Sequence, residues 1–248
     1  KPVMENVVDS SQYIFTQGRD VNSLICVPLT TKSRKFGLVL IEHKYNNAFD
    51  EENVRLLDII GQQVGIALEN AELYQKMQEL ANKDGLTGIY NRLYFQKRLE
   101  DEFNYSLLEG YPLSLAIFDI DYFKRFNDTF GHLFGDKVLK CLAELVQSSL
   151  RKSDILARFG GEEFIILFPH TTLEEACEKV EFLRQTVSHT PIRDELVTAF
   201  VTVSFGVSSY PQCSNNENEL LRAADDALYE AKASGRNCVK PASTLNAS

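Results

Sequence analysis

Residues 155–168 read Ile-Leu-Ala-Arg-Phe-Gly-Gly-Glu-Glu-Phe-Ile-Ile-Leu-Phe, and this stretch decides the fold of the larger part of the chain. Two short apolar runs flank Gly160-Gly161, which predicts two strands joined by a two-residue hairpin turn. Glu162 and Glu163 follow the glycines directly. Because successive side chains of a strand point to opposite faces, one of these carboxylates must lie on the covered or cleft side of the sheet.

An unpaired carboxylate on a covered face is energetically costly, and a divalent cation beside it would remove that cost. The alternative interpretation is that Glu162 and Glu163 are solvated turn residues. The turn glycines would also let a phosphate or a nucleobase approach the backbone closely.

Strands and helices alternate on both sides of this hairpin. Apolar runs predict strands over residues 113–119, 196–207 and 238–240, and apolar side chains at helical spacing predict helices over residues 91–108, 136–149, 173–187 and 216–234. This alternation predicts an α+β fold in which helices cover a sheet.

The strand predicted over residues 113–119 ends in Asp119-Ile120-Asp121. Ligands in such sheets bind beyond the carboxyl ends of strands, so Asp119 is a candidate metal ligand. Asp121 is interpreted as the N-cap of the next helix. Two carboxylates at neighbouring strand ends, here Asp119 and Glu162, are what a Mg²⁺ site for phosphoryl or nucleotidyl transfer requires.

The segment Lys232-Ala-Ser-Gly-Arg236 closes the last predicted helix. Gly235 is interpreted as the left-handed residue that ends the helix, and cations near this end complement the helix dipole. The alternative is that Lys232 or Arg236 binds terminal phosphates.

The first third of the chain predicts two strands, residues 24–29 and 36–42, and then a long helix capped by Asp50, because no proline interrupts residues 50–82. The helix has two apolar stripes, and its first half is apolar on more than one face. After Asn70 only a narrow seam of Leu73, Met77 and Leu80 remains, which is typical of a coiled coil. We therefore expect a dimer-forming linker, the alternative being a helix buried within one domain.

Composition excludes several classes of protein. The net charge of the 248 residues is −9 and the pI is about 5.1, so there is no basic face for nucleic-acid binding. No apolar run approaches the roughly 20 residues of a membrane helix, and we expect no membrane span. Five widely spaced cysteines suggest reduced thiols and a cytoplasmic location. Because the first residue is Lys1, the chain is interpreted as a fragment of a longer protein. A segment before Lys1 could tether that full-length protein to a membrane.

Several motifs, occurring in order over residues 84–241, resemble a GGDEF diguanylate cyclase domain. They are Asp84-x-Leu86-Thr87-Gly88-x-x-Asn91-Arg92, Phe118-Asp119-Ile120-Asp121-Tyr122-Phe123-Lys124-Arg125-Phe126-Asn127-Asp128, Phe130-Gly131-His132, Gly135-Asp136, Gly160-Gly161-Glu162-Glu163-Phe164 and Lys232–Arg236. The resemblance implies a nucleotidyl-cyclase-like sheet covered by helices. Leu93 departs from the second Arg that is common at this position, which we expect to affect packing.

The resemblance also implies roles for individual residues. Asp119, Glu162 and the Ile120 carbonyl would bind Mg²⁺, or Mn²⁺ in its place, with Glu163 as a further ligand and Glu162 as the base for the ribose 3′-hydroxyl. Other positions match substrate-binding residues: Asn127 and Asp136 for the guanine edge, Phe123 and Lys124 beside the phosphates, Gly160 and Gly161 in the turn, and Lys232 and Arg236 as cations for the phosphates.

The activity implied by the resemblance is condensation of two GTP molecules into cyclic di-GMP with release of two pyrophosphates. Each domain would hold one GTP, so two domains must face each other, and we expect a homodimer through the helix at residues 55–82. The alternative is a catalytically silent module that binds GTP or cyclic di-GMP and regulates a partner. An ATP-using cyclase is disfavoured by Asn127 together with Asp136.

Arg151 and Asp154 form an RxxD sequence at the offset before Gly-Gly that resembles the inhibitory product site of the family. The alternative interpretation is a helix end, with Arg151 in the last turn and Asp154 capping the start of a strand. Some relatives add arginines from the next helix, where this chain has Glu178 and Phe182, so we expect weak inhibition.

Residues 1–70 resemble the C-terminal part of a GAF sensor domain through Ser23-Leu24-x-x-Val27-Pro28-Leu29, Phe36-Gly37 and Phe49-x-Glu51-Glu52. The segment is short for that domain, so we expect an incomplete ligand pocket, and no residue identifies the sensory ligand. The predicted organisation is a partial GAF-like domain at 1–70, a helical coiled-coil linker at 71–85 and a GGDEF domain at 86–248.

Overall fold

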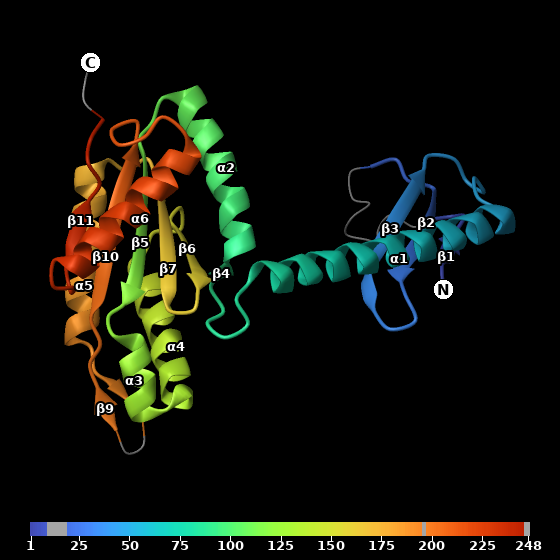
Figure 1. The fold of residues 1–248 in the computed structure, drawn as a ribbon. Coiled ribbons are helices and arrows are strands. Elements are labelled where there is room, and N and C mark those ends of the chain that lie inside the picture. The colour runs from blue at the N-terminus through green and yellow to red at the C-terminus, as the bar shows by residue number, and fades with distance from the viewer. Residues whose placement is uncertain (9–18, 195–196, 246–248) are drawn as a thin grey trace. The chain divides into compact units, whose positions relative to one another are not determined.

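The structure is a computed structural model that describes residues 1–8, 19–194 and 197–245 (Figure 1). The chain divides into two compact units, Lys1–Ala81 and Asn82–Ser248. Leu196, where a strand was predicted to begin, lies outside the described residues.

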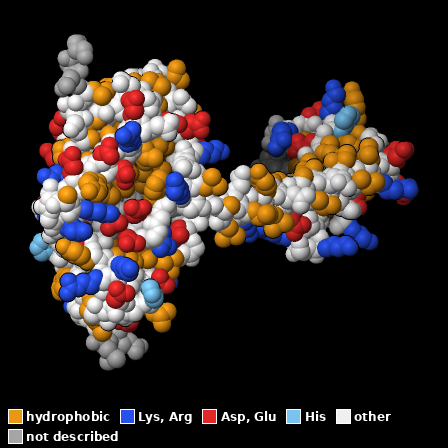
Figure 2. Space-filling model, viewed as in Figure 1, with side chains coloured by type: hydrophobic (Ala, Val, Ile, Leu, Met, Phe, Trp, Pro, Cys, Tyr) orange, Lys and Arg blue, Asp and Glu red, His pale blue; other side chains and the backbone are white. Residues whose placement is uncertain are grey.

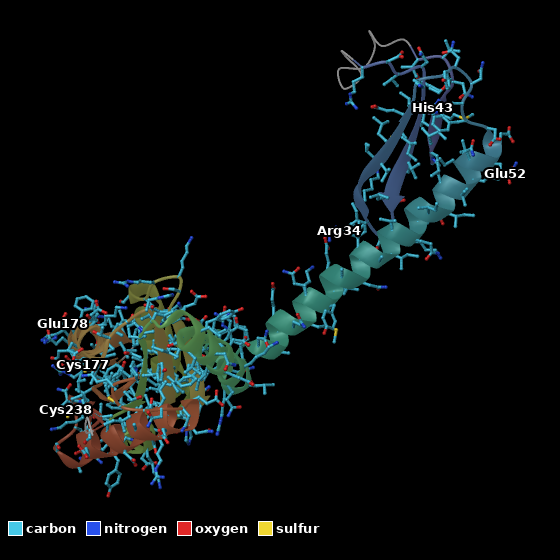
Figure 3. The ribbon with its side chains drawn as sticks, turned by 90° about the horizontal axis from the view of Figure 1, so that it is seen from above. Arg34, His43, Glu52, Cys177, Glu178 and Cys238 are labelled. Carbon is cyan, nitrogen blue, oxygen red and sulfur yellow. The ribbon has the colours of Figure 1, made fainter. Side chains whose placement is uncertain are left out.

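The first unit combines a three-stranded antiparallel sheet, in the order β1-β2-β3, with one long helix. Its elements are β1 (Val3–Glu5), β2 (Ser23–Thr30), β3 (Lys35–His43) and α1 (Glu51–Asn82). Asp50 Oδ1 accepts a hydrogen bond from the Asn53 backbone N–H at 2.8 Å, so the predicted N-cap is confirmed. Figure 3 shows Arg34 in the β2–β3 connection, where it pairs with Glu72 of α1.

Helix α1 approaches β2 through two glycines, Gly61 and Gly65, which are its buried residues. A Cβ at Gly61 would lie 2.5 Å from Val27 Cγ1, and a Cβ at Gly65 would lie 2.8 Å from the Thr30 carbonyl oxygen. The bulky apolar residues of α1 therefore stay largely outside this contact. Figure 2 shows hydrophobic side chains exposed along α1, and Leu80 is 79% exposed.

The second unit is built on a six-stranded mixed sheet in the order β11-β10-β5-β7-β6-β4. The strands of this sheet are β4 (Tyr90–Asn91), β5 (Leu113–Ile120), β6 (Ile155–Gly160), β7 (Glu163–Pro169), β10 (Val203–Tyr210) and β11 (Val239–Pro241), and a separate ribbon pairs β8 (Ile192–Arg193) with β9 (Thr198–Ala199). The helices are α2 (Arg92–Glu109), α3 (Phe123–Phe130), α4 (His132–Ser149), α5 (Leu173–His189) and α6 (Glu217–Ala233).

Strand alternation in β5 supplies both layers of the core. Ala116, Phe118 and Ile120 pack in the cluster that contains α4 and α5, whereas Leu113, Leu115 and Ile117 pack in the cluster of α2 and α6. A helical layer thus covers each face of the sheet (Figure 1). By the same alternation, the side chain of Asp119 lies on the same face of the sheet as Leu113, Leu115 and Ile117, the face that α6 covers.

Two predicted elements differ from the structure. Helix α4 begins at His132, four residues before the predicted start at 136, because Gly131, with φ of 86°, separates it from α3 and lets the chain restart a helix at once. The strand predicted over 196–207 is divided, since Thr198–Ala199 pairs with β8 and only Val203–Tyr210 joins the main sheet.

The surface and hydropathy fit the composition. Within the described parts of the chain, no helix combines the length and hydropathy that crossing a bilayer requires. Figure 2 shows acidic and basic side chains interspersed over the visible face of the second unit. All five cysteines are free thiols.

Candidate active site

The β6–β7 hairpin turns one residue later than predicted. Gly160 pairs with Glu163 across the ladder, so the two loop residues are Gly161 and Glu162 rather than Gly160 and Gly161. A register shift between Arg158 and Gly160 marks a bulge, and a bulge adds one residue to its strand. Gly161 has a positive φ of 38°. Glu162 therefore projects from the turn, while Glu163 begins strand β7.

A cleft of about 540 Å³ lies between this turn and the α3–α4 pair. Six of the residues predicted for the site contribute to its lining: Phe123, Lys124, Asn127, Asp136, Gly161 and Glu162. They come from the consecutive helices α3 and α4 and from the β6–β7 turn, which follows 25 or more residues later in the sequence. The predicted Gly160, Glu163, Asp119, Ile120, Lys232 and Arg236 lie outside this lining.

The Asn127 side chain occupies space in the cleft that is open only because Gly135 has no side chain. A Cβ at Gly135 would lie 1.8 Å from Asn127 Oδ1. That oxygen is buried and has no hydrogen-bond partner within the described residues. An unsatisfied buried acceptor is costly, so a donor group from a bound ligand would stabilise this arrangement.

Asp119 lies on β5, the strand that pairs with β7, and its carboxylate contacts Lys232. Lys232 Nζ is 3.0 Å from Asp119 Oδ2, and Asp119 is the register partner of Glu163 on the adjacent strand. Burial raises the pKa of Asp119 to about 6; Lys232 opposes this shift, and the charges of Glu162 and Glu163 add to it. Asp119 thus lies within the electrostatic influence of two further carboxylates, Glu162 and Glu163, as well as of Lys232.

The donor set suits a hard divalent cation, since Asp119, Glu162 and Glu163 offer carboxylate oxygens and the buried Ile120 offers only its carbonyl. Among the described residues, however, no three acidic, histidine or cysteine side chains converge closely enough to hold a metal ion. Lys232 is the cation at Asp119 instead. These residues fit a divalent cation on condition that Lys232 moves away from Asp119.

The interpretation of Asp121 as an N-cap is wrong. Tyr122 occupies the N-cap of α3 and makes no side-chain capping bond. The buried Asp121 carboxylate instead accepts hydrogen bonds from Thr202 Oγ1 and Ser204 Oγ, both at 2.6 Å, and from the Asn237 backbone N–H at 3.0 Å. These partners lie 81 to 116 residues away, so no local pattern could have indicated them.

Arg158 lines the cleft and was not predicted as a site residue. Its Nε donates to the Gly161 carbonyl at 2.9 Å, and its Nη1 lies 3.1 Å from Asp84 Oδ1. Burial alone would raise the pKa of Asp84, but hydrogen bonds from Thr87 and Arg158 outweigh it and lower the pKa. Arg158 thereby ties the turn to the first residues of the second unit.

The RxxD pair forms a local turn. The Arg151 backbone N–H donates to Asp154 Oδ2 at 3.1 Å, and Arg151 follows α4, which ends at Ser149, rather than lying in its last turn. Asp154 is only 7% exposed, its Oδ1 has no partner within the described residues, and Lys179 lies 3.9 Å from its Oδ2. The cation at this carboxylate is thus Lys179, whereas Arg151 contacts it through its backbone N–H.

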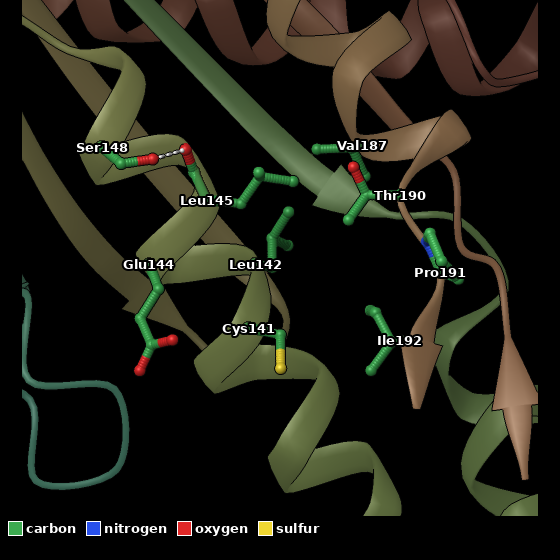
Figure 4. A pocket seen from close by; sticks show the side chains of 9 residues that line it. All are labelled: Cys141, Leu142, Glu144, Leu145, Ser148, Val187, Thr190, Pro191 and Ile192. Atoms are coloured by element: carbon green, nitrogen blue, oxygen red, sulfur yellow. Dashed lines mark hydrogen bonds between the residues drawn. The ribbon is translucent and has the colours of Figure 1, made fainter. Parts of the chain in front are cut away.

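Two further hollows carry no residue of the predicted site. One is a groove lined by Cys177 and Glu178 of α5 together with Cys238 (Figure 3). The other, of about 410 Å³, lies between α4 and the α5–β8 connection and has mainly apolar walls, including Leu142 and Ile192 (Figure 4).

A comparison with protein families gives a match over residues 81–238 to the model described as diguanylate cyclase, GGDEF domain. The chain belongs to the GGDEF family. A GAF domain model matches residues 2–70. The predicted resemblances and the α+β fold class are confirmed.

Curated relatives of this GGDEF protein are longer than the chain. Diguanylate cyclase DgcP of Pseudomonas aeruginosa is 37% identical over 238 residues, which cover 93% of this chain and 35% of that protein. Response regulator PleD of Caulobacter vibrioides is 42% identical over 165 residues, 65% of this chain and 36% of its own length. The chain therefore spans about a third of these two relatives.

Solved GGDEF structures are similar in fold. The coiled coil and GGDEF domain of DgcB from Caulobacter crescentus, in complex with c-di-GMP, has a TM-score of 0.69 and 29% identity, covering 78% of this chain and 100% of that one. Diguanylate cyclase SiaD from Pseudomonas aeruginosa, in complex with its activator SiaC, has a TM-score of 0.63 and 34% identity, covering 77% of this chain and 78% of its own.

Proposed function

We propose that this chain is a diguanylate cyclase that condenses two GTP molecules into cyclic di-GMP and releases two pyrophosphates. The observation that carries the proposal is the cleft between the β6–β7 turn and α3–α4, which gathers Asn127, Asp136, Lys124 and Glu162 around one volume. Membership of the GGDEF family and relatives named as diguanylate cyclases support the same activity.

Within this proposal Asn127 and Asp136 bind the guanine edge, because an amide and a carboxylate together offer the acceptor and donor groups that guanine pairs with. Phe123 and Lys124 flank the phosphates. Gly160 and Gly161 allow close approach to the backbone at the turn. Lys232 and Arg236 neutralise the terminal phosphates, the first as a point charge and the second as a bidentate fork.

Diguanylate cyclases of this family use a divalent metal, and we propose Mg²⁺, with Mn²⁺ as a substitute. A bound divalent ion stabilises negative charge on the reacting phosphoryl group. Asp119, Glu162 and the Ile120 carbonyl would hold it, with Glu163 as a further ligand. Glu162 also accepts the proton of the ribose 3′-hydroxyl, since it projects from the turn into the cleft.

One domain has residues for one GTP, so the reaction needs two domains face to face. We propose a parallel homodimer through residues 55–82, in an organisation of a partial GAF-like domain (1–70), a linker (71–85) and a GGDEF domain (86–248). Leu73, Met77 and Leu80 are mostly exposed on α1, as a dimer seam requires in a single chain. Dimerisation through this seam would keep the two catalytic domains at a high effective concentration, so that they need not meet by a rare bimolecular encounter.

We further propose that cyclic di-GMP inhibits weakly at Arg151 and Asp154. Arg151 would form a forked contact with a phosphate or a guanine edge. Lys179 already lies at 3.9 Å from the Asp154 carboxylate, and Glu178 adds a negative charge on the same helix. The carboxylate of Glu178 weakens the attraction between this site and an anionic product, whereas the Lys179 ammonium partly offsets that repulsion.

The test is incubation of the protein with GTP and MgCl₂, followed by chromatographic separation of the nucleotides, with ATP as a parallel substrate. Formation of cyclic di-GMP from GTP alone is expected. Asp119→Asn and Glu162→Gln should abolish product while the proteins remain folded by circular dichroism. A parent protein that binds GTP without turnover would instead identify a catalytically silent regulatory module.

A further inference from the structure

Two residues with left-handed backbone conformations lie against each other near the candidate site. Tyr122 has φ of 57° and Arg236 has φ of 66°. Such conformations are unfavourable for residues other than glycine, and they persist where the surrounding structure enforces them, commonly at functional sites. Tyr122 follows strand β5 and Arg236 follows helix α6, so the pair joins segments 114 residues apart.

The side chains of this pair are stacked. Arg236 Cζ lies 4.4 Å from the centre of the Tyr122 ring, a cation–π distance, and Arg236 Nη1 lies 3.3 Å from the Tyr122 hydroxyl oxygen. Tyr122 is 60% exposed, so its ring contributes little to the core. The contact therefore orients the guanidinium rather than filling a gap in the packing.

The neighbouring residues of each segment are joined through the backbone. The Asn237 N–H donates to Asp121 Oδ2 at 3.0 Å, and Asp121 is itself fixed by the hydroxyls of Thr202 and Ser204. Two contacts thus join these segments. The buried Asp121 carboxylate accepts a hydrogen bond from the Asn237 backbone, and the exposed Tyr122 ring contacts the Arg236 guanidinium. Within the described residues, Nε and Nη2 of Arg236 have no hydrogen-bond partner, so its fork remains available.

We propose that Tyr122 is a positioning residue that, together with Asp121, holds the Arg236 guanidinium ready to bind the terminal phosphates of GTP. This inference rests on the proposed function. A free arginine side chain loses much rotational freedom when it binds a phosphate. Stacking on Tyr122 removes part of that freedom beforehand, while the ring face leaves the guanidinium edge open for a bidentate contact.

The experiment is a double-mutant cycle of Tyr122→Leu and Arg236→Ala, with initial rates of pyrophosphate release measured over a range of GTP concentrations. Tyr122→Leu should raise KM for GTP about 3- to 10-fold with little change in kcat. The same substitution should have no further effect in the Arg236→Ala protein, because the group that Tyr122 orients is then absent.

Two matched variants separate positioning from a general structural role. Tyr122→Phe keeps the ring face and should retain KM within about twofold of the parent. Tyr229→Leu removes a tyrosine on α6 that is 75% exposed and should leave kinetics unchanged. The midpoint of urea unfolding should be the same for Tyr122→Leu and the parent.

A second measurement does not depend on turnover. In nucleotide-free protein, ¹⁵N relaxation at Arg236 Nε should report a more mobile side chain in Tyr122→Leu than in the parent or Tyr122→Phe. Unchanged mobility, or an equal loss from Tyr122→Leu with and without Arg236, would overturn the inference even if the parent makes cyclic di-GMP. A parent that orders Arg236 in this way but neither binds nor converts GTP would overturn the proposed function and the assigned ligand alone.

Discussion

Replacing Gly135 by alanine should impair GTP binding although it adds only one methyl group. In the structure that methyl carbon would lie 1.8 Å from Asn127 Oδ1 and 3.3 Å from Phe123 Cζ. A carbon and an oxygen that are not bonded rarely approach closer than about 3.3 Å. The Asn127 amide must therefore move by more than about 1 Å, which removes it from any geometry suited to a purine edge.

The size of the effect follows from the contacts that are lost. A well-placed bidentate contact between a side chain and a base contributes about 1–3 kcal/mol of recognition, so Gly135→Ala should raise KM for GTP by roughly 5- to 150-fold. Gly135 lies in the first turn of α4, where alanine is the better helix former by up to about 1 kcal/mol. Loss of substrate binding should thus occur without loss of helix stability.

The assay compares Gly135→Ala, Asn127→Ala and the double variant by steady-state kinetics and urea unfolding. All three should show a similar rise in KM, because both single substitutions remove the same contact. The double variant should unfold at a higher urea concentration than Asn127→Ala, since the clash is absent and the helix propensity of alanine remains. A Gly135→Ala enzyme with KM within twofold of the parent would refute the assignment of Asn127.

Three further outcomes are expected. In the folded protein the pKa of Asp119 is raised to about 6, against 3.8 for the free side chain. In the presence of a chelator, Asp119 should therefore stabilise the fold fully below pH 4, and the free energy of unfolding should fall by up to about 3 kcal/mol as the pH rises past 6. Asp119→Asn should remove this pH dependence in urea unfolding, and an unchanged pH dependence would assign it to another group. Leu73→Glu with Leu80→Glu should give monomers by light scattering, with turnover that is low at low protein concentration and partly restored at high concentration, whereas a parent that is monomeric and fully active contradicts the dimer proposal. Arg151→Ala should relieve inhibition by added cyclic di-GMP without lowering the initial rate; inhibition that persists would leave the RxxD as a turn only.

Local sequence patterns predicted most of the longer helices and strands and their order, but not the short strands β1, β4, β8 and β9. The apolar runs around Gly160-Gly161 predicted the hairpin, and helical spacing predicted α2, α5 and α6 close to their observed bounds. These predictions succeed because strand alternation and helical periodicity act over fewer than about ten residues. The motifs likewise determined the family, since their residue types and spacing are written directly in the chain.

Tertiary structure alone decided how the side chains meet. The bulge that places the turn at Gly161-Glu162 depends on pairing between strands. The hydrogen-bond partners of Asp121 lie on segments 81 to 116 residues away. The ion pair between Lys232 and Asp119, and the contact of Asn127 with Gly135, arise in the same way from packing. Periodicity assigns a residue to a face of its own element, but which atoms face it across the gap depends on how the elements pack together.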